Sequence, residues 1–395
     1  MRLRPPVYLM FLLAIPLLGA LVWGQSTAVY VESNRSDRNS ILAYRNEGGT
    51  LSFLGEFPTD GKGVFDLSLK LGPFDSDQDV VTNAEGTVLY AVNGGSDTIA
   101  AFRIEADGSL SKLPRSPFSS GGTDPVSVGI SRGTLVVANK ANDPSRPKLN
   151  QPSYTSFSLG PDGAIENGPL STTIAGIGSS PSQVDVSSGK RLVFDAQFLG
   201  GHLQSFLVDG DGSLISEDFE AVDTSTGPQP LGLWTHPARP ILYAGFTSSS
   251  ALAVYTFDST GHLEFVRTVP NSGKAICWIR SNATGTRLYT ANTGDNSISV
   301  YDTALPLEPV EIQHLVLKGL GNALQLTLDP RGDFLYVVTQ RASKSIPLGE
   351  GNTLHVLRIH TGTGKVSEED TSIVKLPVPR GTRPQGVAAV ELLGH

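Results

Sequence analysis

The sequence predicts an all-β protein built from seven copies of one four-stranded unit, and three observations support that prediction. The chain has 395 residues with 43 glycines and 26 prolines, a density of turn-forming residues that is too high for a helical protein. Hydrophobic residues make up 39% of the chain, which is enough to bury a core. One strand pattern recurs along the chain at a nearly regular spacing.

Each copy contains a short apolar strand with tyrosine or valine at one fixed place. The aligned residues lie 46 to 60 positions apart, and they are Tyr30, Tyr90, Val136, Val193, Tyr243, Tyr289 and Tyr336. That spacing is the period of a four-stranded propeller blade. Seven copies therefore predict a single domain over residues 25–395, a seven-bladed β-propeller.

Within a copy, the elements follow the order of a propeller blade. After the tyrosine strand, for example 89–93, comes an alternating strand such as 98–102, then a tight hairpin and a weaker outer strand. The hairpins carry dipeptides that tolerate positive φ: Gly48-Gly49, Asp107-Gly108, Asp162-Gly163, Asp211-Gly212, Thr260-Gly261 and Thr363-Gly364. Before the tyrosine strand we expect an innermost strand that opens with a proline or glycine phrase, such as Asp124-Pro125-Val126-Ser127.

The two ends of the repeat region complement each other. The first copy begins near Ala28 and lacks an innermost strand, whereas the segment from Arg383 to Val390 has the pattern of an innermost strand with no copy after it. We expect the C-terminal segment to complete the first blade, so that the ring closes and leaves no sheet edge unpaired. A closed ring favours a monomer.

Residues 1–24 predict a secretory signal peptide. Arg2 and Arg4 precede an apolar run from Val7 to Trp23, and the small residue Gly24 follows it. The alternative is an uncleaved anchor helix, but 17 residues that include a proline are short for a membrane span. The expected location is therefore the periplasm or the exterior of the cell, with no membrane contact after the signal is removed.

Composition excludes several classes of function. The chain has 30 basic and 38 acidic residues, and its net charge of −8 argues against nucleic acid as a partner. A single cysteine, Cys277, excludes an intramolecular disulfide framework and a cysteine-based metal cage. Because no two histidines have metal-ligand spacing and no glycine loop suits a phosphate, we expect neither a metal nor a cofactor.

One repeat carries a family resemblance. The phrase from Gly285 to Asn292, Gly-Thr-Arg-Leu-Tyr-Thr-Ala-Asn, is followed by Asp-Asn-Ser-Ile-Ser-Val-Tyr at 295–301. This pattern resembles the lactonase family of seven-bladed propellers, which includes 6-phosphogluconolactonase-like enzymes and carboxymuconate-cyclising enzymes. The family is related to propellers with a Tyr-Val-Thr-Asn repeat, many of them non-enzymatic surface proteins. The resemblance implies the fold and, as an activity, hydrolysis of a sugar-type lactone.

The resemblance does not supply catalytic residues. Family enzymes are expected to carry His-Pro-His, Gly-Pro-Arg-His and Asn-Glu phrases, where this chain has Ser-Pro-Ser-Gln at 180–183, Gly-Pro-Gln-Pro at 227–230 and Gly-Phe-Thr at 245–247. Serine and glutamine cannot replace an imidazole or a carboxylate in acid–base chemistry. Of the seven histidines, only His202 is expected on the ligand-binding face, either as a weak catalytic candidate or as an exposed loop residue.

A candidate ligand site lies where the loops that enter the innermost strands meet, around one mouth of the channel. Basic residues in these loops would attract an anion: Lys274, Lys318, Arg380 and Arg383. Amide and hydroxyl side chains in or beside the channel strands would bind a sugar-like molecule: Ser127, Gln183, Gln229, Asn322, Gln325 and Gln385. The alternative is that the cations are solvated loop residues. Two long loops, 139–154 and 340–352, are expected to cover the same face.

Two functions stay open at this point. The first is an exported hydrolase that acts on a sugar-type lactone at the channel mouth. The second is a non-catalytic extracytoplasmic propeller that binds an anionic or saccharide ligand or a protein partner, since a fold does not specify a function.

Overall fold

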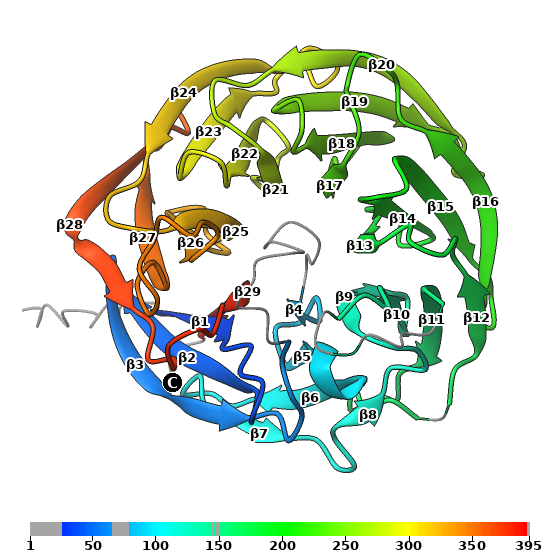
Figure 1. Ribbon diagram of the computed structural model, residues 1–395, viewed down its shortest axis with the longest axis horizontal. Coiled ribbons are helices and arrows are strands. Elements are labelled where there is room, and N and C mark those ends of the chain that lie inside the picture. The colour runs from blue at the N-terminus through cyan, green and yellow to red at the C-terminus, as the bar shows by residue number, and fades with distance from the viewer. Residues whose placement is uncertain (1–25, 65–78, 144–145, 147–150, 167, 393–395) are drawn as a thin grey trace, which may run out of the picture.

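The computed structural model describes residues 26–64, 79–143, 146, 151–166 and 168–392. The predicted signal peptide lies outside these residues. The strands form seven antiparallel sheets that stand side by side around a central axis (Figure 1). The seven-bladed propeller predicted from the repeat is therefore confirmed.

The blades are numbered along the chain, and the strands of each are given from the innermost outward. Blade 1 consists of β29 (Gln385–Leu392), β1 (Ser26–Glu32), β2 (Ser40–Glu47) and β3 (Thr50–Pro58). Blade 2 consists of β4 (Val80–Thr82), β5 (Val88–Asn93), β6 (Thr98–Ile104) and β7 (Leu110–Lys112), with β8 (Phe118–Ser119) also paired to β6 and a 3-10 turn η1 (Gly94–Ser96). Blade 3 consists of β9 (Pro125–Ser131), β10 (Thr134–Asn139), β11 (Ser153–Ser158) and β12 (Ser171–Ile174).

The other four blades follow the same plan. Blade 4 consists of β13 (Pro181–Val186), β14 (Leu192–Gln197), β15 (His202–Val208) and β16 (Leu214–Ala221). Blade 5 consists of β17 (Pro230–Thr235), β18 (Ile241–Phe246), β19 (Ala251–Phe257) and β20 (Leu263–Pro270). Blade 6 consists of β21 (Ile276–Ser281), β22 (Arg287–Asn292), β23 (Ser297–Asp302) and β24 (Val310–Val316). Blade 7 consists of β25 (Asn322–Leu328), β26 (Phe334–Gln340), β27 (Thr353–Ile359) and β28 (Val366–Lys375).

The ring closes through the C-terminal strand, as predicted. Strand β29 pairs antiparallel with β1, with Val390 opposite Ala28 and Ala388 opposite Tyr30. The last strand in sequence thus becomes the innermost strand of the first blade (Figure 1). This pairing satisfies the inner edge of β1, which would otherwise be open to other chains.

The hydrophobic core lies between neighbouring blades. Between blades 6 and 7, for example, Tyr289 and Val300 pack with Leu326 and Leu335 in one buried cluster. Because each sheet buries both faces in this way, a central strand can be apolar on both faces, as in Leu-Tyr-Ala-Val at 89–92. The described part of the chain contains no helix with the length and hydrophobicity that a membrane span requires.

The repeated tyrosine and the repeated hairpin bind each other across blades. Tyr30 donates its hydroxyl hydrogen to the carbonyl of Gly108 in the hairpin of blade 2, at 3.0 Å. Tyr90 does the same to Gly163 of blade 3 at 2.6 Å, and Tyr289 to Gly364 of blade 7 at 3.0 Å. In these three blades, the two sequence signals that define the repeat are therefore the two halves of one inter-blade contact.

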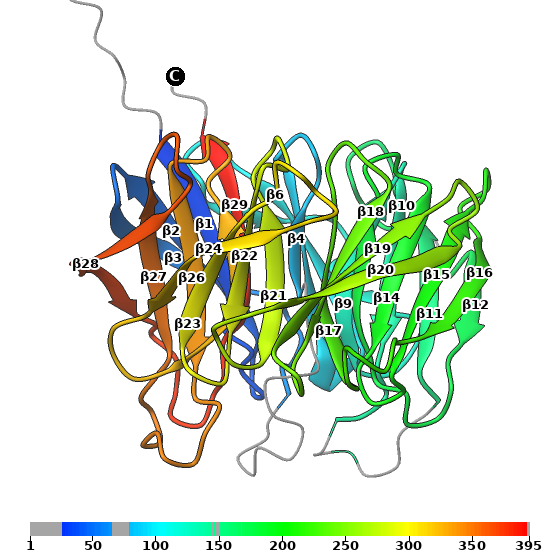
Figure 2. The same ribbon diagram turned by 90° about the horizontal axis from the view of Figure 1, so that it is seen from above.

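The propeller has two faces, which Figure 2 shows edge-on. We call the face that carries the hairpins between third and fourth strands the hairpin face. The turns that follow the innermost strands lie on the same side. We call the opposite face, where loops enter the innermost strands, the loop face. The candidate ligand residues were predicted for the loop face.

Candidate functional site

Two acidic side chains meet at the loop face beside the innermost strands. Glu32 is the last residue of β1, and Asp79 immediately precedes β4 in the next blade. Both side chains are buried, with 1% of Glu32 and none of Asp79 exposed. A carboxylate removed from water is costly unless it is hydrogen-bonded or holds a proton, so the partners of this pair decide its chemistry.

Two glutamines from other blades orient Asp79. Gln325 of β25 donates from Nε2 to Oδ2 of Asp79 at 3.0 Å, and Gln385 of β29 donates to Oδ1 at 3.4 Å. Glu32 accepts a hydrogen bond from Nδ2 of Asn39 on its Oε1 atom. Its other oxygen, Oε2, is buried and has no hydrogen-bond partner among the described residues. One oxygen of the pair is therefore buried without a hydrogen bond from the described residues.

Burial raises the pKa of both acids. It raises the pKa of Asp79 to about 7, although the Gln325 hydrogen bond and the nearby Lys140 ammonium pull that pKa down. Burial, and secondarily the charge of Asp79, raises the pKa of Glu32 well above its ordinary value. Burial thus favours the protonated form of both carboxyl groups. One group that accepts a proton beside one that donates it is an arrangement suited to acid–base catalysis.

The predicted amide and hydroxyl residues divide into two groups. Gln325 and Gln385 meet at Asp79, as described above. Ser127 and Gln183 instead bind the next blade: the Ser127 hydroxyl accepts from the backbone N–H of Val184 at 3.0 Å. Gln183 donates to the Leu233 carbonyl at 3.0 Å and accepts from the N–H of Leu233 at 2.6 Å.

The remaining amides contact loops. Asn322 donates to the carbonyl of Thr293 at 2.7 Å, and Gln229 accepts from the hydroxyl of Thr247 at 3.3 Å. The Oε1 atom of Gln325 also accepts from the backbone N–H of Gly386. Several predicted ligand donors thus satisfy the backbone of neighbouring strands or loops. Sequence patterns do not reveal these contacts, because the partners lie 29 to 61 residues away along the chain.

The four predicted cations lie in different settings. The Lys318 ammonium pairs with Asp370 on the outermost strand β28, so it points away from the axis. Lys274 and Arg380 are exposed on the loop face. Arg383 is half-buried, and its carbonyl accepts a hydrogen bond from Nδ2 of Asn34 at 3.0 Å. Lys140, from the predicted long loop after β10, is buried near Asp79.

His202 takes a packing role in the structure. It is the first residue of β15, its Nδ1 lies 2.6 Å from the carbonyl oxygen of Gly200, and its ring stacks on Phe219 at 4.2 Å. Cys277 is buried with Phe198, Leu231 and Leu324 on the inner side of the ring. Among the described residues, no group of three or more histidine, cysteine or acidic side chains is arranged to hold a metal ion.

The acidic pair was absent from the sequence prediction. A signal for Asp79 exists, because it occupies the same place before β4 that Asp124 occupies before β9. That equivalence is hard to recognise in the sequence, because the innermost strand of blade 2 is only three residues long. No sequence pattern marks Glu32, because its role depends on Asp79, which blade 2 brings close to it.

Comparison with known proteins agrees with this fold. Residues 218–325 match the family model described as lactonase, 7-bladed beta-propeller. No curated protein matches the chain.

Solved structures extend the likeness to nearly the whole chain. A putative 6-phosphogluconolactonase from Bacteroides uniformis is 14% identical, with a TM-score of 0.70, over 93% of this chain and 100% of that one. A periplasmic gluconolactonase from Pseudomonas aeruginosa is 15% identical, with a TM-score of 0.71, over 92% and 99%. A protein from Lactobacillus plantarum is 18% identical, with a TM-score of 0.70, over 93% and 99%.

At these identities the structures establish the fold alone, and the sequence match lies mainly in blades 5 and 6. The chain thus carries the sequence signature of the lactonase seven-bladed propellers in that region and their architecture throughout, which confirms the resemblance that its repeat predicted.

Proposed function

We propose that this protein hydrolyses a sugar-type lactone at the loop face, with Asp79 as general base and Glu32 as general acid. The observation that carries the proposal is the buried Asp79–Glu32 pair, because the pKa of Asp79 is raised to about 7. A base with a pKa near the working pH combines a useful deprotonated fraction with adequate basicity. The similarity to a protein described as a gluconolactonase supports the choice of substrate class.

The reaction would use both acids once in each turnover. Asp79 takes a proton from a water molecule, whose oxygen attacks the carbonyl carbon of the lactone. The ammonium of Lys140, which lies near Asp79, would stabilise the negative charge that develops on the carbonyl oxygen. The ring C–O bond then breaks, and the departing alkoxide takes the proton of Glu32. The product is the open-chain hydroxy acid, and a proton passing from Asp79 to Glu32 restores the pair.

The test is hydrolysis of glucono-1,5-lactone and 6-phosphogluconolactone, followed by acid release and corrected for the uncatalysed rate. We expect kcat to rise with pH through about 7 as Asp79 ionises. Asp79→Asn is expected to lower kcat by about 100-fold or more, the usual contribution of a general base. Asp195→Asn is the matched control, because Asp195 is also a fully buried aspartate with a raised pKa but lies at the boundary of blades 3 and 4.

A non-catalytic binding propeller is the alternative, and the replacement of the family's histidine, arginine and glutamate phrases favours it. No turnover of either lactone above the uncatalysed rate, together with saturable binding of the lactone, would establish this alternative. Equal loss of turnover in Asp79→Asn and Asp195→Asn would also remove Asp79 from the mechanism.

We further propose that the chain is exported and that it is a monomer. The apolar segment at 7–23 supports export, and the closed ring supports the monomer. N-terminal sequencing of protein recovered from the periplasm or the culture medium should begin near residue 25. Light scattering of the purified protein should give the mass of one chain. An intact N-terminus in the membrane fraction, or a dimer mass, would contradict these expectations.

A further inference from the structure

A cavity of about 650 Å³ opens on the hairpin face between blades 6 and 7. Its walls are three turns: 282–286 after β21, 329–333 after β25 and 360–364 between β27 and β28. A second cavity of about 340 Å³ lies toward the axis, where β4, β17, β21 and β29 face one another. Both cavities are lined by Trp234, Arg280 and Thr327, so they adjoin each other.

Contacts between blades hold the three walls in place. The strand that follows the first wall binds the third wall: Arg287 donates from Nε to the carbonyl of Thr363 at 2.7 Å, and Tyr289 donates to that of Gly364 at 3.0 Å. In the second wall, Asp329 accepts a hydrogen bond from the hydroxyl of Thr27 in blade 1. A cavity with walls fixed in this way loses little conformational entropy when it binds a molecule.

The charges around the two cavities balance. Each arginine in the lining lies near at least one aspartate, and Lys190 of the axial cavity brings the set to four basic and four acidic side chains. An anion would meet the aspartates and a cation would meet the basic groups, so net charge gives neither an advantage. The neighbouring charges are Arg331 with Asp329 and Asp333 at 3.6 Å, Arg287 with Asp302 at 3.1 Å, and Arg280 with Asp185 in the axial cavity.

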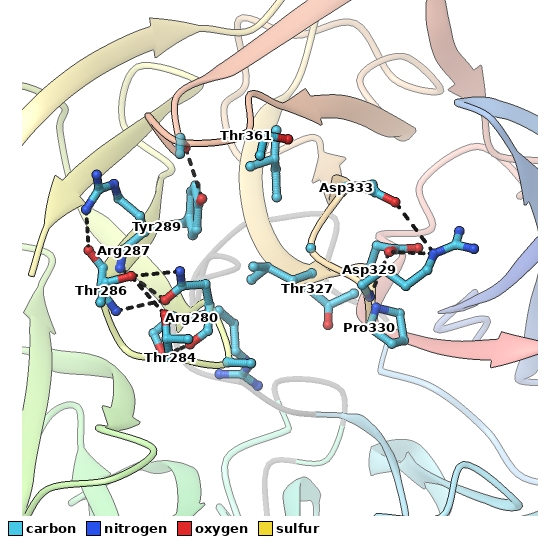
Figure 3. Close-up of a pocket in the computed structure, with 18 of the residues that line it drawn as sticks. Arg280, Thr284, Thr286, Arg287, Tyr289, Thr327, Asp329, Pro330, Asp333 and Thr361 are labelled. Carbon is cyan, nitrogen blue, oxygen red and sulfur yellow. Dashed lines mark hydrogen bonds and ion pairs between the residues drawn. The ribbon is translucent and has the colours of Figure 1, made fainter. Parts of the chain in front are cut away.

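Hydroxyl groups line the larger cavity on three sides. Those of Thr327 on β25 and Thr361 in the third wall have no hydrogen-bond partner among the described residues. In the first wall, the hydroxyl groups of Thr284 and Thr286 hydrogen-bond each other at 2.8 Å. Figure 3 shows Thr327 across the cavity from Thr284. Because a hydroxyl group both donates and accepts, this lining suits a molecule with several hydroxyl groups of its own.

Apolar surface lies between these polar groups. Trp234, Leu328 and Pro330 also line the larger cavity. A wholly apolar molecule would separate the hydroxyl groups and ion pairs from water without replacing the lost hydrogen bonds, which is costly. A polyhydroxylated ring carries hydroxyl groups at its edge and C–H groups on its faces, so it matches both kinds of surface.

We propose that this cavity binds a neutral sugar, a monosaccharide or disaccharide, with ring hydroxyl groups on Thr327 and Thr361. The site lies on the face opposite the proposed hydrolase site and does not depend on it. A sugar acid or an amino sugar would bring a net charge that the balanced lining does not compensate. Glucose and maltose therefore serve as the neutral probes, and gluconate and glucosamine as the charged ones.

Tryptophan fluorescence reports on this site. The chain has three tryptophans: Trp234 lines both cavities, Trp278 packs against Arg280, and the third is Trp23. In a full-length Trp23→Phe protein, every tryptophan signal comes from Trp234 and Trp278. We expect glucose or maltose to change the emission in a saturable way with a Kd on the order of 1 to 10 mM, and titration calorimetry should give the same Kd. Gluconate and glucosamine should each bind at least about fivefold more weakly.

Threonine variants locate the sugar. Thr327→Val keeps the shape of the side chain, removes its hydroxyl group and should raise the Kd for maltose about fivefold. Thr361→Val should raise it by a similar factor, and it lies in an exposed turn, so it remains informative if the change in β25 disturbs folding. Thr50→Val is the matched control, because Thr50 follows an exposed hairpin of blade 1 on the same face and lines neither cavity. It should leave the Kd unchanged.

Three results would overturn the proposal. They are the absence of a saturable response to glucose and maltose by either method, binding of gluconate or glucosamine as tight as that of the neutral sugars, and a Kd that Thr50→Val raises as much as Thr327→Val and Thr361→Val do. Asp79→Asn should bind maltose normally. Loss of binding in that variant would instead assign the sugar to the loop face, so the two proposals fail separately.

Discussion

Gln183 provides the sharpest test of how the blades are held together. Its fully buried amide donates to the carbonyl of Leu233 and accepts from the N–H of the same residue, at 3.0 and 2.6 Å. These two backbone groups belong to the innermost strand of blade 5, on the edge that pairs with none of the described strands. Gln183→Met keeps the length of the side chain and removes both hydrogen bonds.

The magnitude follows from the two groups left unsatisfied. An unpaired buried backbone group costs about 1–3 kcal/mol, so the pair costs about 2–6 kcal/mol. We take about 3 kcal/mol, a value in the lower half of that range. An unfolding entropy of about 2.1 cal/mol/K per residue amounts to roughly 0.8 kcal/mol/K for a chain of this length, so Tm should fall by about 4 °C.

The assay is thermal and urea unfolding followed by circular dichroism. Gln229→Met is the matched control, because Gln229 is only half-buried and accepts a single 3.3 Å bond from the hydroxyl of Thr247. It should lower Tm by less than about 1 °C, in the range of ordinary surface changes. Equal stability of the two variants would refute the view that channel amides support the blade edges.

Three further outcomes follow from the structure. A Cβ at Gly273 would lie 2.1 Å from Nδ2 of the buried Asn292, so Gly273→Ala should destabilise the protein by about 1–3 kcal/mol, and unchanged urea unfolding would contradict this contact. Burial raises the pKa of Asp195 to about 8, so the folded state binds more protons than the unfolded state between about pH 4 and 8. The free energy of unfolding should therefore fall as pH rises through that window, and Asp195→Asn, which retains an acceptor for Tyr154, should flatten the dependence; the same slope in both proteins would exclude Asp195 as its source. Deleting the chain from residue 385 onward removes β29 and opens the ring, so cooperative melting should be lost, whereas a melt identical to that of the full chain would show that closure adds no stability.

The fold was predictable because its information is local and repeated. Tyrosine strands and Asp-Gly or Thr-Gly hairpins recur with the blade period, and each expresses a backbone preference that operates within a few residues. Even the closure by 385–392 was visible as a strand without a blade. The physical purpose of the repeat was not visible: only the structure shows that Tyr30 binds the hairpin carbonyl of Gly108.

The site was less predictable because its contacts join residues from different blades. Gln183 and Gln325 were both expected to face a ligand, yet Gln183 binds the strand of the next blade while Gln325 reaches Asp79, 246 residues away. Lys318 was expected at the channel mouth, but its nearest acid lies on the outer strand β28. In each case the sequence identifies a polar side chain near the channel. The direction in which that side chain points depends on which neighbouring residue lies within hydrogen-bond distance, and only the structure shows this.

By itself, then, the sequence determined the number of blades, their strand order and the strand that closes the ring, since these depend on short-range patterns of hydrophobicity and turn chemistry. The tertiary structure alone decided which polar groups meet. The acid pair of Glu32 and Asp79 arises where strands from separate blades approach the axis. Burial at that junction, a property of the assembled ring, is what raises the pKa of Asp79.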